Sequence, residues 1–192
     1  MITPDEILDF WFAGDPAAHR KVWFEKDAEF DDACSSFADA VRDARAGAFD
    51  HWTDTPRGTL ALIILLDQFS RNLHRGSPEA FAADAKALGI ARSAVARGFD
   101  LELGPVERMF IYLPFEHSEN LADQDESVRL YATLREAIGE DSIRYGESHR
   151  DVIRRFGRFP HRNTALGRVS TPDELAYLAH PERGSERWTQ PI

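Results

Sequence analysis

Apolar side chains recur every three or four residues along most of the chain, and this spacing predicts helices. In the first such segment four apolar side chains fall on one helical face: Ile7, Leu8, Trp11 and Phe12. The spacing predicts helices over residues 4–12, 27–46, 57–72, 78–97, 123–138, 145–156 and 172–179. A further helix begins at Pro105, and Pro114 is expected to kink or break it. No segment alternates strictly between apolar and polar residues, so the sequence predicts an all-α fold.

Helix starts are marked by a hydroxyl residue followed directly by proline. The pair occurs at Thr3-Pro4, Thr55-Pro56, Ser77-Pro78 and Thr171-Pro172. A Ser or Thr side chain caps the first turn by accepting a backbone hydrogen bond, and proline suits the first helical position. These four sites therefore predict where helices begin.

The connections between the predicted helices are short, which favours antiparallel helix pairs stacked as a compact bundle or a superhelix. No clean internal repeat near 34 residues is visible. We expect residues 1–180 to form a single all-helical domain and residues 181–192 to form a C-terminal tail.

The net charge of the chain limits the classes of partner that it can bind. It carries 33 acidic and 23 basic residues, a net charge of −10, and this charge disfavours general binding to nucleic acid or to an anionic membrane. The longest apolar run, Leu60–Leu66, is far shorter than the ~20 residues that span a bilayer. The N-terminus lacks a secretory signal pattern, so we expect a cytoplasmic protein.

Common catalytic motifs are missing from the sequence. It contains no Walker A loop, no dinucleotide-binding glycine pattern, no HExxH and no GxSxG. The single cysteine, Cys34, permits no internal disulfide and lies in a helical pattern typical of a buried small residue. The sequence therefore predicts no cofactor and no metal, and it leaves open whether the protein is an enzyme.

Polar residues interrupt the apolar pattern at the end of the most hydrophobic helix. Asp67 and Arg71 lie four residues apart on one face, with Gln68 between them. Such a pair is most often a weak surface ion pair. Here it continues a helix that is apolar all round, and buried charges must be paired or line a cavity.

A second polar segment follows Pro114. Glu116 and Glu119 lie three residues apart with His117 between them, an arrangement that could orient a general base or ligate a metal together with His117. The alternative is a solvated helix N-terminus, where acidic residues favour the helix dipole.

The third segment, residues 149–168, holds six arginines and two histidines but one acid. Because Gly157, Pro160 and Gly167 disfavour an uninterrupted helix, it predicts a helix end followed by a turn. The turn presents Arg158, His161, Arg162 and Asn163. Such a set suits a carboxylate or phosphate ligand, or it pairs internally with the acids of the other two segments.

The chain resembles a bacterial family in these same three segments. LALIILLDQFSRN (60–72), YLPFEHSEN (112–120) and residues 149–168 resemble the bacterial domain-of-unknown-function family 924, as do ILDFWF (7–12) and STPDELAYL (170–178). The resemblance covers about residues 3–180, with Ser70 where the family is expected to prefer proline. It implies an all-α fold of the tetratricopeptide-like, right-handed superhelix type. It brings no established activity.

The sequence supports three hypotheses. In the first, a polar pocket binds a small anionic or phosphorylated ligand through Asp67, Gln68, Arg71, Glu116, His117, Glu119, Arg158, His161, Arg162 and Asn163. If the protein is an enzyme, His117 or His161 would transfer protons beside a carboxylate such as Glu116, while Arg158 and Arg162 hold the anion. In the second, the chain is a peptide- or protein-binding module. In the third, the arginines and carboxylates form a structural network without catalytic role. The oligomeric state is left open.

Overall fold

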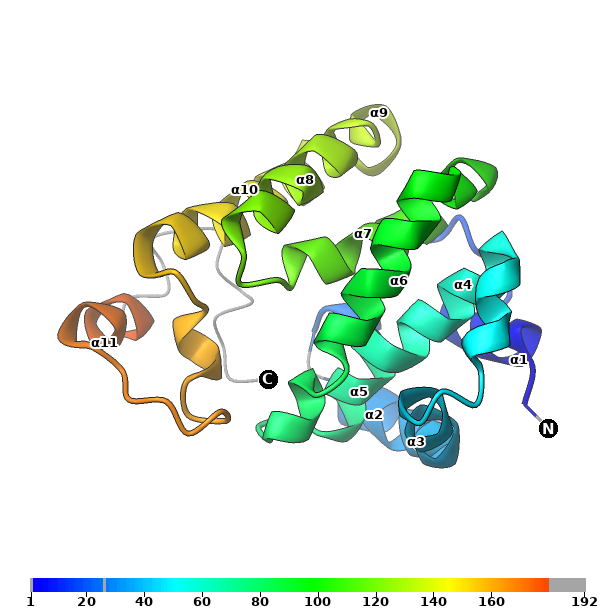
Figure 1. The fold of residues 1–192 in the computed structure, drawn as a ribbon, viewed down its shortest axis with the longest axis horizontal. Helices are drawn as coiled ribbons and strands as arrows, with labels where there is room; N and C mark the ends of the chain where they lie inside the picture. Colours follow the sequence, from blue (N-terminus) through cyan, green and yellow to red (C-terminus); the bar gives the residue numbers. More distant parts are fainter. Residues whose placement is uncertain (1, 26, 180–192) are drawn as a thin grey trace.

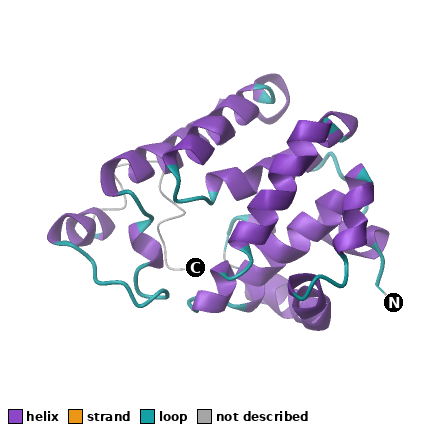
Figure 2. Ribbon diagram, viewed as in Figure 1, coloured by secondary structure: helices purple, strands orange, loops and turns teal. Residues whose placement is uncertain are grey.

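The computed structural model describes residues 2–25 and 27–179, and for residues 140–142 it describes the backbone alone. The α-helices of the described part are α1 (Pro4–Phe12), α2 (Ala28–Cys34), α3 (Ala38–Arg45), α4 (Pro56–Ile63), α5 (Ser70–Leu73), α6 (Asp84–Arg97), α7 (Pro105–Glu116), α8 (Leu121–Ala132), α9 (Arg135–Ile138), α10 (Glu140–Phe156) and α11 (Pro172–Leu178). These residues contain no strand, which confirms the all-α class (Figure 2). The predicted superhelical arrangement stays a prediction, and residues 181–192 lie outside the described residues.

Shorter helical turns connect and extend these helices. They are η1 (Lys21–Trp23), η2 (Ser35–Phe37), η3 (Asp50–Asp54), η5 (Pro78–Phe81), η6 (Phe99–Glu102) and η7 (Pro160–Arg162), all of 3₁₀ type, and the π-helical turn η4 (Ile64–Phe69). No helix of the described residues is both long and apolar enough to cross a membrane.

All four predicted hydroxyl caps are confirmed. The side chains of Thr3, Thr55, Ser77 and Thr171 each accept a hydrogen bond from a backbone N–H in the first turn of the helix that follows. Thr3 and Thr171 form complete capping boxes with the glutamate three residues later.

Several helix boundaries differ from the predictions. The helix predicted over 27–46 is interrupted by η2, and the one over 123–138 is divided into α8 and α9. Helix α10 begins at Glu140, five residues earlier than expected. Pro114 does not break α7, which continues to Glu116. A proline removes one backbone hydrogen bond, and this loss is tolerated near the end of a helix because few bonds follow it.

The helix formed by α4, η4 and α5 runs through the middle of the N-terminal part of the chain (Figure 1). Helices α1, α6 and α7 contact α4, and α3 and α6 contact η4. Every residue from Gly58 to Asn72 is buried. Gly58 is needed where α4 meets η3, because a Cβ atom there would lie 2.3 Å from the carbonyl oxygen of Trp52. The segment that carries Asp67 and Arg71 is therefore the enclosed centre of the fold.

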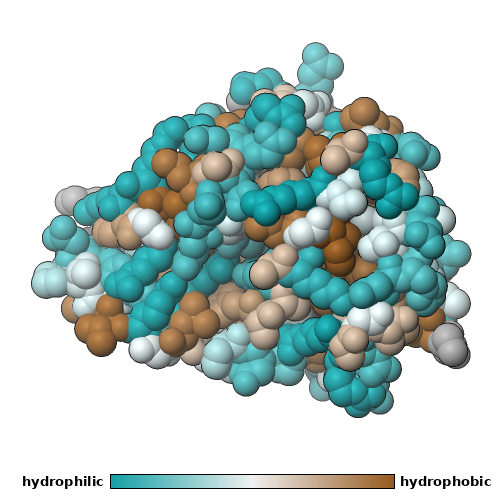
Figure 3. All heavy atoms as spheres, viewed as in Figure 1, coloured by the Kyte–Doolittle hydropathy of each residue, from teal (hydrophilic) through white to brown (hydrophobic). Residues whose placement is uncertain are grey.

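Helix α7 leads from this centre to the C-terminal helices. It packs against α6 on one side and α8 on the other, and α8 lies along α10 (Figure 1). A small apolar cluster of Val152, Ile153 and Phe159 lies beyond the main core. Polar side chains cover most of the face seen in Figure 3, with isolated apolar residues between them. The end of α7 is therefore placed between the enclosed central helix and the turn after α10.

Candidate functional site

The central helix widens into a π-helical turn where its polar residues begin. Residues Ile64–Phe69 form this turn, and all six are buried. Asp67 and Gln68 lie within it, and Arg71 follows in α5. A π-helical turn inside an α-helix often marks a functional site, because the extra residue shifts the side chains that follow it. Here it accompanies the change from an apolar helix to a charged one.

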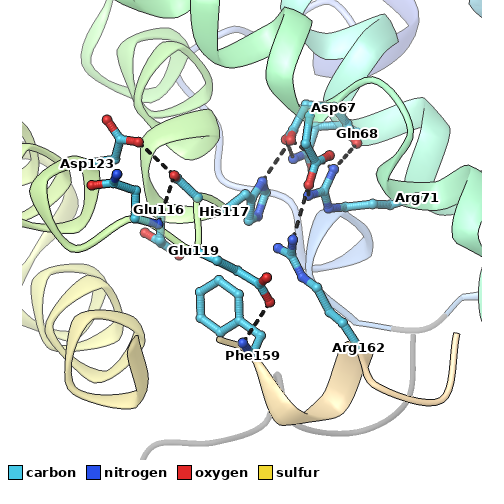
Figure 4. Close-up of polar contacts among 12 residues, drawn as sticks. Asp67, Gln68, Arg71, Glu116, His117, Glu119, Asp123, Phe159 and Arg162 are labelled. Atoms are coloured by element: carbon cyan, nitrogen blue, oxygen red, sulfur yellow. Dashed lines mark hydrogen bonds and ion pairs between the residues drawn. The ribbon is translucent and has the colours of Figure 1, made fainter. Parts of the chain in front are cut away.

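Asp67 is the centre of a polar cluster that we call the Asp67 cluster: Asp67, Arg71, Asp84, His117 and Arg162. Its Oδ1 atom lies 2.8 Å from Nη1 of Arg71 and 2.8 Å from Nδ1 of His117 (Figure 4). Burial alone would raise the pKa of Asp67, but the Arg71 guanidinium and His117 hold this pKa well below its ordinary value. Asp67 is therefore a buried, ionised carboxylate.

Asp84, at the start of α6, joins two arginines. Nη2 of Arg71 and Nη1 of Arg162 both lie 3.1 Å from the same oxygen, Oδ2. Both guanidinium groups also lie over the ring of Phe81, 5.7 Å and 4.7 Å from its centroid. Sequence analysis did not identify Asp84, because an acid in the first turn of a helix is common and carries no specific signal.

Within the described part of the chain, Arg162 makes hydrogen bonds through one nitrogen only. It is 6% exposed, and its Nη1 atom donates to Asp84. Its Nε atom is buried and has no hydrogen-bond partner among the described residues. Burial lowers the pKa of Arg162 to about 10, and the Asp84 carboxylate opposes this decrease. The side chain is thus a buried cation with less compensation than its neighbours.

His117 caps the C-terminal end of α7 and turns its ring towards Asp67 (Figure 4). Burial is the largest cause of its lowered pKa, and the Arg71 charge adds to it, while Asp67 opposes the decrease. A neutral imidazole bound to a carboxylate through Nδ1–H leaves Nε2 as a hydrogen-bond or proton acceptor. The Asp67–His117 pair therefore has the geometry of an oriented general base.

Glu116 is the last residue of α7 and lies next to His149 of α10. It is buried, and burial together with the Asp67 charge raises its pKa to about 8. Its Oε1 atom lies 3.3 Å from Nδ1 of His149, but this nitrogen is closer, at 2.9 Å, to the carbonyl oxygen of Tyr145. Burial lowers the pKa of His149 to about 3. Glu116 and His149 are therefore two neutral neighbours at pH 7 rather than an ion pair.

The other predicted site residues lie outside the Asp67 cluster, and two of them pair with Glu174. Arg158 donates from Nε and Nη2 to both carboxylate oxygens of Glu174, at 2.6 Å and 2.8 Å. Asn163 donates to Glu174 and to Ser170. These contacts fasten the turn after α10 to the start of α11. The structure thus brings Arg162, but not Arg158, to Asp67 and His117.

Glu119 and His161 also lie outside the Asp67 cluster, and each has different neighbours. Glu119 accepts hydrogen bonds from both Nη atoms of Arg168, at 2.7 Å and 3.0 Å. It also accepts one from the backbone N–H of Phe159 (Figure 4). The His161 ring lies 5.5 Å from the Phe159 ring. Burial, followed by the charge of Arg162, lowers the pKa of His161 well below its ordinary value. Gln68 remains beside Asp67 and donates to its Oδ2 atom.

A hollow of about 420 Å³ lies elsewhere on the molecule, between η3 and α6. None of the residues that line it belongs to the Asp67 cluster. Its cations are already engaged: Lys86 pairs with Asp50 at 2.7 Å, and Arg97 donates to the carbonyl of Thr53. Among the described residues, no group of three or more His, Cys, Asp or Glu side chains is arranged to hold a metal ion.

Comparison with known proteins gives a family but no activity. The model of a family of bacterial proteins of unknown function, DUF924, matches residues 7–182. The chain is 40% identical to a protein of unknown function from Agrobacterium tumefaciens whose structure is solved, with a TM-score of 0.80 over 91% of this chain and 96% of that one. No curated protein matches it. The chain belongs to the DUF924 family of bacterial proteins.

Proposed function

We propose that the protein binds a small anionic ligand at the Asp67 cluster, with Arg162 as the group that recognises the anion. The observation that supports this proposal most directly is the incomplete pairing of Arg162. Its Nη1 atom is bound to Asp84, while its Nε atom is buried with no partner among the described residues. A buried donor left without a partner costs about 1–3 kcal/mol, and more when it is charged.

The other arginines of this region each engage carboxylates through two nitrogens. Arg158 binds both oxygens of Glu174 through Nε and Nη2. Arg71 engages Asp67 through Nη1 and Asp84 through Nη2. Arg168 leaves its Nε atom buried without a partner among the described residues, as Arg162 does, but both of its Nη atoms bind Glu119. A purely structural network would be expected to engage a second nitrogen of Arg162 as well. The Nε–Nη2 edge of a guanidinium is the edge that binds a carboxylate or phosphate through two parallel hydrogen bonds. In Arg162 this edge donates no hydrogen bond to the described residues.

His117 suggests what the site does with the ligand. Arg162 and His117 reach the cluster from η7 and from the end of α7 (Figure 4). Because Asp67 orients the imidazole at 2.8 Å, His117 is placed to accept a proton or a hydrogen bond from a ligand held by Arg162. Proton transfer on a bound anion is the second candidate function. The peptide-binding hypothesis stays a prediction.

The proposal is tested by measuring thermal unfolding with acetate, phosphate or sulfate against chloride, at constant ionic strength. We expect at least one of these anions to raise the melting temperature of the wild type. Arg162→Gln, which removes the guanidinium, should abolish the rise. Arg162→Lys should weaken it, because lysine keeps the charge but lacks the planar pair of donors.

Arg154→Gln is the matched control. Arg154 is an arginine on the exposed side of α10 that pairs with Asp125 and Asp151. This variant should respond to the anion as the wild type does. An equal response in Arg162→Gln would contradict the proposal, and so would the absence of any anion effect on the wild type.

A further inference from the structure

Asp84 uses only one of its two carboxylate oxygens within the described part of the chain. Its Oδ2 atom accepts hydrogen bonds from Arg71 and Arg162, each at 3.1 Å. Its Oδ1 atom is buried and has no hydrogen-bond partner among the described residues. A buried acceptor without a donor costs free energy, because it has lost its contact with water and gained nothing in return. The Asp67 cluster therefore contains an unpaired acceptor as well as the unpaired donor of Arg162.

This acceptor and this donor lie on two groups that are bonded to each other. The bond runs from Nη1 of Arg162 to Oδ2 of Asp84. The unpaired atoms, Nε of the guanidinium and Oδ1 of the carboxylate, belong to the same two planar groups. Figure 4 shows the Arg162 guanidinium pointing towards the side chains of Asp67 and Arg71. One small molecule that lies against the Arg162–Asp84 pair can therefore contact both unpaired atoms.

The other carboxylate of the cluster, Asp67, offers no comparable acceptor. Its Oδ1 atom pairs with Arg71 and with His117, each at 2.8 Å. Its Oδ2 atom accepts a hydrogen bond from Gln68. Among the carboxylates of the described cluster, the unpaired oxygen thus belongs to Asp84.

We propose that the ligand of this site is a small carboxylate with a hydrogen-bond donor on the carbon next to its carboxyl group, as in α-hydroxy acids and α-amino acids. The carboxylate binds the Nε–Nη2 edge of Arg162, and the adjacent hydroxyl or ammonium group donates to Oδ1 of Asp84. This inference rests on the proposed function and adds to it the class of ligand. A carboxylate matches the arginine edge because it is planar and accepts two parallel hydrogen bonds.

Asp84 is then a residue that determines specificity. A carboxylate without the donor leaves Oδ1 of Asp84 buried and unpaired, whereas one with the donor satisfies it. A site built to form a hydrogen bond rejects ligands that lack the matching group, because its own polar atom then stays unpaired. A hydrogen bond to a charged group is strong enough to tighten binding by about ten- to a hundredfold.

Three ligands of nearly equal size isolate the effect of the donor. Next to the carboxyl group, glycolate carries a hydroxyl group, glycine an ammonium group and propionate a methyl group. Their dissociation constants for the full chain are measured by isothermal titration calorimetry at pH 7, with ionic strength held by sodium chloride. We expect glycolate or glycine to bind about ten- to a hundredfold more tightly than propionate. The tighter of the two identifies the donor as a hydroxyl or an ammonium group.

Asp84→Asn tests the acceptor. Its amide oxygen can still accept hydrogen bonds from the two arginines, but an NH₂ group, which only donates, replaces Oδ1. This variant should bind propionate and the preferred ligand with similar affinity. Asp123→Asn is the matched control, because Asp123 also lies in the first turn of a helix, α8, and pairs with an arginine, Arg92. The control should keep the wild-type preference.

The wild-type series tests the donor without any substitution. Equal affinities for the three ligands would overturn the inference, while the anion site stands if Arg162→Gln weakens their binding. A preference that survives in Asp84→Asn would also overturn it, because the donor would then bond to another acceptor. If none of the three binds, the inference is wrong, and the response to acetate, phosphate and sulfate decides separately on the proposed function. Unchanged binding of all three to Arg162→Gln would contradict both.

Discussion

Replacing Asp67 with alanine is expected to lower the free energy of unfolding by about 3–5 kcal/mol, a large part of the stability of a typical domain. Asp67 is completely buried, and it is a carboxylate partner of both the buried Arg71 and His117. Without it, Arg71 keeps one carboxylate partner, Asp84, together with its hydrogen bond to the backbone carbonyl of residue 67 and its position over the Phe81 ring. Breaking a buried pair costs much more than removing both partners, because one charge remains uncompensated at low dielectric.

Urea unfolding of the wild type and of Asp67→Ala at pH 7 measures this loss. The control is Asp39→Ala, which removes an acid on the exposed face of α3 that pairs with Arg42. Exposed ion pairs contribute little, so this control should unfold near the wild-type urea midpoint. Similar midpoints for the two variants would show that Asp67 is not the centre of a buried charged cluster.

Glu116 gives the second large effect, a dependence of stability on pH. Its pKa in the folded chain is about 8, against an ordinary value of 4.5. Between these two values the folded chain binds more protons than the unfolded chain, so stability falls as the pH rises, by up to about 1.4 kcal/mol per pH unit. The contribution of protonated Glu116 is complete below pH 4.5 and is lost as the pH rises through 8. Glu116→Gln, which stays neutral and keeps the shape, should not lose it.

Denaturation curves at pH 5, 6, 7 and 8 test this expectation. The stability of Glu116→Gln relative to the wild type should increase steadily across the series, by a few kcal/mol in total, and should level off above pH 8. Glu126→Gln, which alters an acid paired with Arg129 on α8, should leave the wild-type slope unchanged. Parallel curves for Glu116→Gln and the wild type would refute a neutral, buried Glu116.

The sequence predicted the fold class and the four hydroxyl-capped helix starts because these depend on local chemistry. A hydroxyl residue before proline fixes a helix start whatever packs against it, as at Thr55 and Thr171. The π-helical turn at Ile64–Phe69 was not predicted, because a segment that is apolar on every face shows no change of period when one residue is inserted. Residues that depend on tertiary contacts, such as the start of α10, were placed less accurately.

In the candidate site, too, features that depend on local sequence were predicted and those that depend on tertiary contacts were not. Asp67, Arg71 and His117 were identified because they are polar residues at the ends of apolar helices, and the structure brings them into contact. Arg158 and Arg162 lie in the same predicted turn, yet one pairs with Glu174 and the other with Asp84. The packing of α6 and α11 decides which acid faces each arginine. The spacing of residues in the sequence does not reveal that packing.

The most direct test of the proposed anion site is the ¹⁵N–¹H spectrum of the arginine Nε–H groups during titration with acetate. Arg168 provides a control within the same molecule. Its Nε atom is also buried without a partner among the described residues, but both of its Nη atoms bind Glu119. We predict that the Nε–H signal of Arg162 moves with acetate and reaches a plateau, while that of Arg168 stays in place. If the two signals move together, or if the Arg162 signal does not move, Arg162 is not the anion-recognising group.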